Sequence, residues 1–202
     1  AESALTRYWQ RLRQLAGLAP AGSQLNVYIS EQATLTYAWV QRHFPANLHG
    51  GEFEPDPGKR KTLTAYLAKL GGHGKVVFRD VTRLGFGTGT IDAVISFDVL
   101  EHVPDYRAAI SEFARILAPG GLCVATFPFN DRPRTDVRAR LDGAGDIEHL
   151  MAPEYHGDPL GNSILCYYHF GWDVLDAFRV AGLRRAEMVM PYSLAEGLPY
   201  GM

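Results

Sequence analysis

Residues 91–129 read IDAVISFDVLEHVPDYRAAISEFARILAPGGLCVATFPF, and this stretch decides the fold. It opens on an apolar run, Ile91 to Phe97, that is typical of a buried strand. Apolar side chains then recur at helical spacing between Tyr106 and Leu117, and Pro119-Gly120-Gly121 ends that predicted helix. A second apolar run, Leu122 to Phe127, predicts a strand buried on both faces of a parallel sheet. The stretch therefore predicts a strand–helix–strand unit.

The same alternation extends on both sides of this unit. Short apolar runs predict further strands at Leu25–Ile29, Leu48–Phe53, Lys75–Arg79 and Ala186–Met190. Helical spacing predicts further helices at Ser3–Leu18, Thr34–His43, Leu63–Leu70 and Trp172–Ala181. Strands that alternate with helices imply right-handed crossovers. We therefore expect a single α/β domain over residues 1–202, with a doubly wound, mostly parallel sheet, helices on both faces and an N-terminal helix within residues 1–22.

Composition excludes several classes of protein. The chain has 202 residues, of which 47% are hydrophobic and 21% charged, as in an ordinary globular domain. Twenty basic against 22 acidic residues give a net charge of -2, which argues against the broad basic surface of a nucleic-acid-binding protein. Neither a membrane-length apolar run nor a signal-peptide pattern is evident, and two cysteines cannot form a disulfide framework. We expect a cytoplasmic protein without nucleic-acid or membrane partners.

Acidic side chains follow the predicted strands. Ligands of parallel sheets bind beyond the carboxyl ends of the strands. Four predicted strands carry an acid at or just after that end, namely Glu31, Glu52, Asp80 and Asp98. A carboxylate there can accept two hydrogen bonds from a ribose diol or one from an exocyclic amine. Each acid could instead cap the next helix, but the series as a whole favours ligand binding.

The stretch quoted first resembles the class I S-adenosylmethionine-dependent methyltransferases. The residues that carry the resemblance are Asp92, Leu100-Glu101-His102-Val103, Glu112, Arg115-Ile116-Leu117 and Pro119-Gly120-Gly121. The resemblance implies the Rossmann-like methyltransferase fold, with S-adenosylmethionine as cofactor. It also implies methyl transfer by in-line displacement, and the acceptor that we expect is a small or sugar-like molecule.

The resemblance also implies which residues bind the cofactor. Glu52 matches the family's acid that binds the ribose hydroxyls. Asp80, followed by Val81, matches the acid that contacts the adenine amino group. Phe97 and Asp98 match the strand end that lies against the cofactor and faces the acceptor.

The loop after the first predicted strand departs from the family. Residues 30–34 read SEQAT, where the family has a glycine-rich loop whose backbone approaches the cofactor closely. Either the loop is a working variant, in which Glu31 accepts from the cofactor's ammonium group, or the domain is a catalytically inactive binding module. Glu31 could also act only as an N-terminal charge on the following helix.

The stretch 130–165 is too long for an idle connection and predicts a lid or acceptor-binding insertion. It contains His149 and His156 among tyrosines and acids, as a site for a polar acceptor would require. We expect His156, together with His102, to be catalytic on the acceptor side.

These histidines could instead bind a metal ion. If the chain turns helically after the fourth predicted strand, Asp98, Glu101 and His102 lie on one face, and His149 or His156 could complete a divalent-ion site, for which zinc fits best. Because Leu-Glu-His-Val is common in family members that hold no metal, we expect no metal here.

Overall fold

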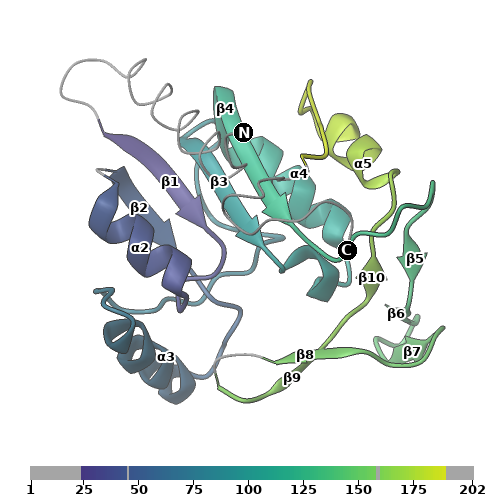
Figure 1. Ribbon diagram of the computed structural model, residues 1–202, viewed down its shortest axis with the longest axis horizontal. Coiled ribbons are helices and arrows are strands. Elements are labelled where there is room, and N and C mark those ends of the chain that lie inside the picture. The colour runs from purple at the N-terminus through teal and green to yellow at the C-terminus, as the bar shows by residue number, and fades with distance from the viewer. Residues whose placement is uncertain (1–23, 45, 158–159, 190–202) are drawn as a thin grey trace, which may run out of the picture.

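A four-stranded parallel sheet forms the centre of the computed structural model, which describes residues 24–44, 46–157 and 160–189. The strands are β1 (Leu25–Ile29), β2 (Ala46–Gly50), β3 (Ile91–Phe97) and β4 (Leu117–Thr126), in the order β2-β1-β3-β4. All three strand pairs are parallel, and Figure 1 shows the carboxyl ends of the strands together at one edge. This arrangement confirms the predicted α/β class. The expected helix Ser3–Leu18 lies outside the described residues.

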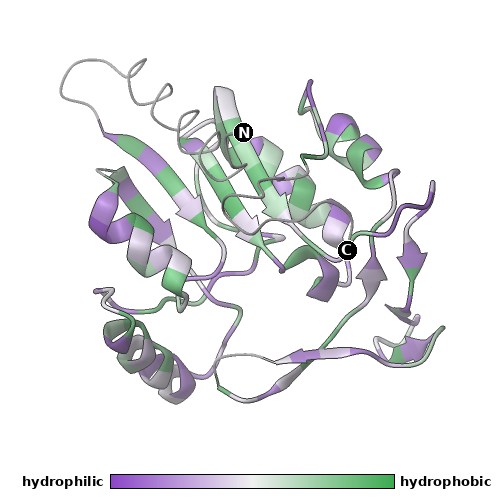
Figure 2. Ribbon diagram, in the orientation of Figure 1, coloured by the Kyte–Doolittle hydropathy of each residue, from purple (hydrophilic) through white to green (hydrophobic). Residues whose placement is uncertain are grey.

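Helices cover both faces of the sheet. They are α2 (Leu35–His43), α3 (Pro57–Lys69), α4 (Tyr106–Ile116) and α5 (Val174–Val180). Side chains along β1 point alternately to the two faces of the sheet, so the core has two parts. Val27 and Ile29 pack in one part with Leu67 of α3, whereas Tyr28 packs in the other with Phe113 of α4. Figure 2 shows the sheet as the most apolar layer. Within the part of the chain that the structure describes, no helix is long and apolar enough to cross a membrane.

Two predicted strands are wrong. Lys75–Arg79 forms only an isolated bridge between Phe78 and Glu52, because the side chain of Gln32 occupies backbone groups of the segment. Ala186–Val189 has no strand structure, and Met190 lies outside the described residues.

Helix and strand boundaries also shift. The expected helical turns at 63–70 are part of a longer helix, α3, which begins at Pro57 because the Asp56 side chain accepts from the Lys59 amide and caps it. Helix α4 ends at Ile116, and β4 starts at once, before Pro119, with an irregular register opposite Ile91.

The stretch 130–165 is built of short strands. They are β5 (Asp136–Val137), β6 (Ala139–Leu141), β7 (Ile147–His149), β8 (Tyr155–Gly157) and β9 (Ser163–Leu165), followed by β10 (Tyr168–His169). β6 pairs with β7, β8 with β9, and β5 with β10, all antiparallel. In Figure 1 the β8–β9 hairpin runs past the carboxyl ends of the sheet strands. The insertion is therefore close to the edge where ligands of parallel sheets bind.

Candidate functional site

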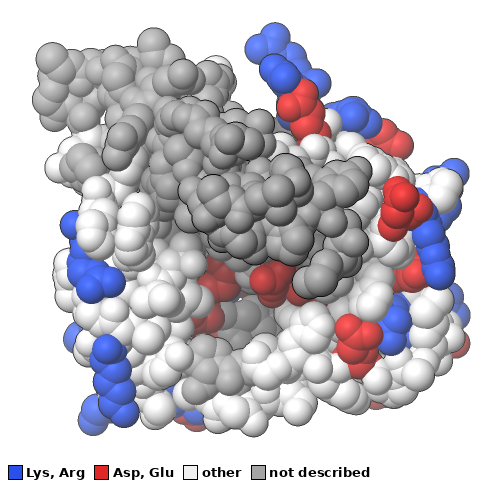
Figure 3. All heavy atoms as spheres, viewed as in Figure 1, with Lys and Arg blue, Asp and Glu red and all other residues white. Residues whose placement is uncertain are grey.

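A cavity of about 310 Å³ opens at the carboxyl ends of β1, β3 and β4. Its lining residues are Glu31, Thr34, Thr36, Phe97, Asp98 and Thr126. Figure 3 shows acidic side chains around a hollow on this face, with Lys and Arg nearer the outline of the molecule. Three of the residues predicted from the sequence are thus brought together, whereas the three threonines were not anticipated.

Glu31 reaches from the end of β1 to the end of β3. Its Oε1 accepts a hydrogen bond of 2.7 Å from the Phe97 amide. Burial raises the pKa of Glu31 to about 8, and the Glu52 carboxylate adds to the rise, while hydrogen bonds from Ser30 and Phe97 oppose it. A positive ligand group beside this carboxyl would favour its ionised form.

Asp98 holds a strained backbone at the end of β3. Its φ of 54° is the only positive value at a non-glycine residue in the described chain. The Asp98 amide donates to the Thr126 carbonyl over 2.9 Å, and the Thr126 hydroxyl donates to Asp98 Oδ1 over 3.1 Å. Strain at a strand end that lines a cavity is typical of a functional site.

The other predicted cofactor residues lie beside the cavity rather than in its lining. Glu52 Oε1 accepts from the Ala33 amide over 2.6 Å and so supports the loop that carries Glu31. Asp80 Oδ1 accepts from the Thr82 amide and hydroxyl, over 2.8 and 2.7 Å, within its own turn. The side chain of Val81 is buried in the core on the α4 side of the sheet.

The glycine-free loop, residues 30–34, packs against Gly50 at the end of β2. The Gln32 side chain lies over Gly50, where a Cβ atom would be 2.6 Å from Gln32 Cγ and 2.6 Å from the Tyr37 ring. Ser30 donates to Ser96 across the strand ends over 3.1 Å. Gly50, at the end of β2, thus leaves room for the side chains of Gln32 and Tyr37 to pack against the strand.

A second cluster follows Asp98 directly. The 3-10 helix η1 (Leu100–His102) presents Glu101 and His102, and β8 presents His156. His156 Nδ1 lies 3.2 Å from His102 Nε2, so the structure brings the two predicted catalytic histidines together. His149 is exposed on β7 and is absent from the candidate metal-binding groups formed by the described residues.

Glu101 is fully buried in this cluster. Neither of its carboxylate oxygens has a hydrogen-bond partner among the described residues. Burial raises the pKa of Glu101 to about 7, and Asp98 adds to the rise. Burial also lowers the pKa of His102, although the carbonyl of Leu165 opposes the shift. Sequence analysis named Glu101 as a possible metal ligand, but it could not show that this carboxyl is buried without a hydrogen-bond partner, because burial is a tertiary property.

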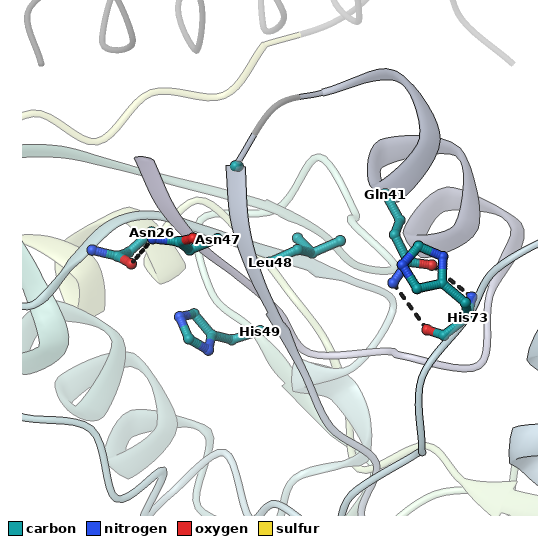
Figure 4. A pocket seen from close by; sticks show the side chains of 7 residues that line it. Asn26, Gln41, Asn47, Leu48, His49 and His73 are labelled. Carbon is teal, nitrogen blue, oxygen red and sulfur yellow. Dashed lines mark hydrogen bonds between the residues drawn. The ribbon is translucent and has the colours of Figure 1, made fainter. Parts of the chain in front are cut away.

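A larger cavity, of about 490 Å³, lies along β2 and is shown in Figure 4. Its polar groups bond to one another: Asn47 donates to Asn26 over 3.2 Å, and Gln41 bonds to the backbone of His73 in both directions. No described residue that lines it is acidic. We therefore take the smaller cavity at the strand ends as the candidate site.

Part of the chain is similar in sequence to known methyltransferases. The family model described as a methyltransferase domain matches residues 35–125, a range that begins directly after the glycine-free loop. Residues 35–125 are therefore similar to a methyltransferase domain. The chain is 38% identical over 74 residues to an uncharacterized methyltransferase of Mycobacterium sp. (strain KMS), which covers 37% of this chain and 28% of that protein. It is 40% identical over 58 residues to an uncharacterized chloroplastic methyltransferase of Arabidopsis thaliana, covering 29% of this chain and 16% of that protein.

A solved structure extends the likeness to the fold. The S-adenosylmethionine-dependent methyltransferase from Mesorhizobium loti superposes with a TM-score of 0.52 at 16% identity, covering 84% of this chain and 79% of that chain. At this identity the likeness shows the fold alone. It confirms the Rossmann-like methyltransferase fold that the resemblance implied.

The family implies S-adenosylmethionine as cofactor, and the residues present fit it. The cofactor carries an ammonium and a sulfonium group. The carboxyls of Glu31 and Asp98, which line the cavity, match this positive charge. Glu52 sits at the neighbouring loop.

Proposed function

We propose that this methyltransferase domain binds S-adenosylmethionine in the cavity at the ends of β1 and β3 and transfers its methyl group to a small polar or sugar-like acceptor. The observation that carries the proposal is the carboxyl of Glu31, held by the Phe97 amide in the lining of that cavity. Ionising a half-buried carboxyl with a raised pKa is costly unless a positive partner arrives. The ammonium group of the cofactor is such a partner.

The chain's own residues act mainly by alignment. When bound, S-adenosylmethionine supplies an electrophilic methyl group, so attack needs correct geometry and the exclusion of water more than strong acid or base chemistry. Glu31 anchors the amino-acid end, and the strained turn at Asp98 fixes the strand end beside it. His102 and His156 lie on the acceptor side, where the β8–β9 hairpin passes the strand ends (Figure 1).

One set of contacts favours a second candidate, a binding module without catalysis. Glu52 Oε1 and Asp80 Oδ1, expected at the ribose and adenine, bond instead to the protein's own loops. In such a module the cavity would hold no methyl donor, and the insertion would be the binding surface.

Calorimetric titration with S-adenosylmethionine and with S-adenosylhomocysteine separates the two candidates. We expect micromolar binding by the full chain and a loss of about 10- to 100-fold in Glu31→Gln, because a charge-assisted hydrogen bond contributes about 1.5–3 kcal/mol. Glu187→Gln, at a surface carboxylate paired with Arg185, is the matched control and should bind normally. No binding to either compound by folded protein would favour the non-catalytic module.

A further inference from the structure

Three ligand atoms converge between η1 and β8. Glu101 Oε1 lies 3.7 Å from His102 Nε2 and 3.7 Å from His156 Nδ1, and the two nitrogens are 3.2 Å apart. In a tetrahedral site with metal–ligand bonds near 2.0–2.2 Å, neighbouring ligand atoms are about 3.3–3.6 Å apart. The triangle therefore has the dimensions of a metal site.

The contacts of His102 Nδ1 and His156 Nε2, the ring nitrogens outside the triangle, bear on whether the nitrogens inside it carry a proton. His102 Nδ1 lies 2.8 Å from the Leu165 carbonyl, which can only accept, so Nδ1 carries the proton and Nε2 presents a lone pair. His156 Nε2 lies 3.4 Å from Glu154 Oε1, and in the tautomer that donates to this oxygen His156 Nδ1 presents a lone pair as well. Two lone pairs and a carboxylate thus face one another, an arrangement that repels itself unless a cation lies between them.

Glu101 supplies an independent observation. Its side chain is 0% exposed, and both oxygens lack a hydrogen-bond partner among the described residues. Buried carboxylates are normally paired, hydrogen-bonded or bound to a metal. Because its Oε1 contacts both histidines, the missing partner belongs at the centre of the triangle.

We propose that Glu101, His102 and His156 bind a divalent transition-metal ion, and that zinc is the best match to two imidazoles and one carboxylate. This proposal takes up the metal alternative that the sequence left open, in place of the expectation of no metal. The oxygens that orient the histidines are the outer support such sites need, and Glu154 is itself held by Arg138 over 3.1 Å and His169 over 3.0 Å.

A neighbouring group of possible ligands is weaker. Glu154, His156 and Cys166 also lie within reach of one ion. However, the Cys166 thiol donates to the Tyr168 carbonyl over 3.2 Å, and Glu154 already bonds to Arg138 and His169. These groups have hydrogen-bond partners, whereas neither carboxyl oxygen of Glu101 has one among the described residues, so the ion is assigned to the first triad.

The location suggests what the ion does, a step that rests on the proposed function. Glu101 and His102 lie in η1, shortly after Asp98 in the chain, and Asp98 lines the cofactor cavity. The φ of 54° at Asp98 places it outside the helical turn that the sequence predicted for all three residues, so Asp98 is not a ligand in this cluster. An ion held there would have an open position for an oxygen or nitrogen of the methyl acceptor. We infer that the acceptor class is a molecule that binds metal through the atom to be methylated or through its neighbour.

The test measures metal binding directly, without an activity assay. The full chain is stripped with a chelator, freed of it, and titrated with Co²⁺ by visible absorption and with Zn²⁺ by calorimetry. We expect one equivalent to bind, with affinity at least tenfold weaker in Glu101→Gln and in His156→Ala. His149→Ala, which alters an exposed histidine of the same insertion, should bind as the wild type does. Because Glu101 is buried, His156→Ala on the half-buried β8 position provides the variant that should fold, as circular dichroism will check.

Two results would overturn the metal site. The first is no saturable binding by folded wild type. The second is equal binding by wild type and both variants. In either case nitrogen chemical shifts of the imidazoles should then show a proton shared between His102 and His156. Titration with S-adenosylhomocysteine in the presence of chelator distinguishes the two proposals. If the protein binds S-adenosylhomocysteine but no metal, the cofactor site is upheld and the metal site is rejected.

Discussion

At the scale of single residues, the charge of Glu31 should control cofactor affinity. Its pKa is raised to about 8, so the empty protein holds this carboxyl mostly protonated at neutral pH. Binding an ammonium group requires the ionised form, so binding releases a proton and the affinity rises with pH. We expect the association constant for S-adenosylhomocysteine to rise about tenfold per pH unit below about pH 8 and to level off above it. Calorimetry across this range measures the slope, and Glu31→Gln should abolish it; an unchanged slope in the variant would assign the proton elsewhere.

The strained backbone of Asp98 gives a second residue-scale prediction. Asn tolerates a positive φ nearly as well as Asp and keeps an acceptor for the Thr126 hydroxyl, whereas Ala does neither. We expect Asp98→Asn to leave the free energy of unfolding unchanged and Asp98→Ala to lower it by about 1 kcal/mol. Denaturant unfolding measures both values. Asp98→Gly is the control, because it relieves the backbone and lacks the acceptor; a loss as large as that in Asp98→Ala would attribute the effect to the hydrogen bond.

At the scale of elements, the side chain of Gln32 makes hydrogen bonds to the backbone of residues 75–77 that a neighbouring strand would otherwise make. Its amide donates to the Lys75 carbonyl over 3.0 Å and accepts from the Val77 amide over 3.1 Å. Gln32 is buried, so Gln32→Ala leaves two backbone groups without these partners and should lower the free energy of unfolding by about 2 kcal/mol. Hydrogen exchange at Val77 should accelerate.

The chain contains a matched control for this prediction. Gln41 bonds to the backbone of His73 in the same two-sided way, over 2.9 and 2.7 Å, but at an exposed place (Figure 4). Water can replace those bonds, so Gln41→Ala should cost less than about 1 kcal/mol. Equal losses in the two variants would show that burial does not set the energy of this contact.

Sequence patterns predicted the strands and helices whose spacing of apolar residues can be seen within the segment itself. Apolar runs located β1 and β3, and the apolar face of residues 106–117 located α4, because burial on a sheet leaves its period in the sequence. The segment Lys75–Arg79 has the same apolar character but no ladder, since a side chain from a distant loop occupies its backbone. At the site, Glu31, Phe97 and Asp98, which the sequence and the family resemblance predicted to bind the cofactor, line one cavity, and cofactor binding by them stays a prediction. The orphaned state of Glu101 depends on contacts between η1 and β8, 54 residues apart at His102 and His156, and no local pattern encodes it.

At the scale of the whole molecule, the Glu101–His102–His156 cluster is built from two parts of the chain, the segment that follows β3 and the insertion at residues 130–165. The Tyr167 amide donates to the Glu101 carbonyl over 2.7 Å, and the Leu165 carbonyl accepts from His102 over 2.8 Å. Leu165 and Tyr167 are themselves buried in the core on the α4 side of the sheet. The end of the insertion is thus part of the fold, and the position of His156 opposite η1 follows from the same packing.

The two cores on opposite faces of the sheet should unfold together. Leu67 of α3 is buried on one face of the sheet and Ile110 of α4 on the other, both with 0% exposure, and β1 and β3 contribute to both cores. Leu67→Ala and Ile110→Ala should each lower the free energy of unfolding by about 2–5 kcal/mol. Because the two residues belong to separate clusters, the losses should add within about 0.5 kcal/mol in the double variant. Near- and far-ultraviolet circular dichroism should give one coincident transition for each single variant. Separate transitions would instead mean that the sheet does not couple its two faces.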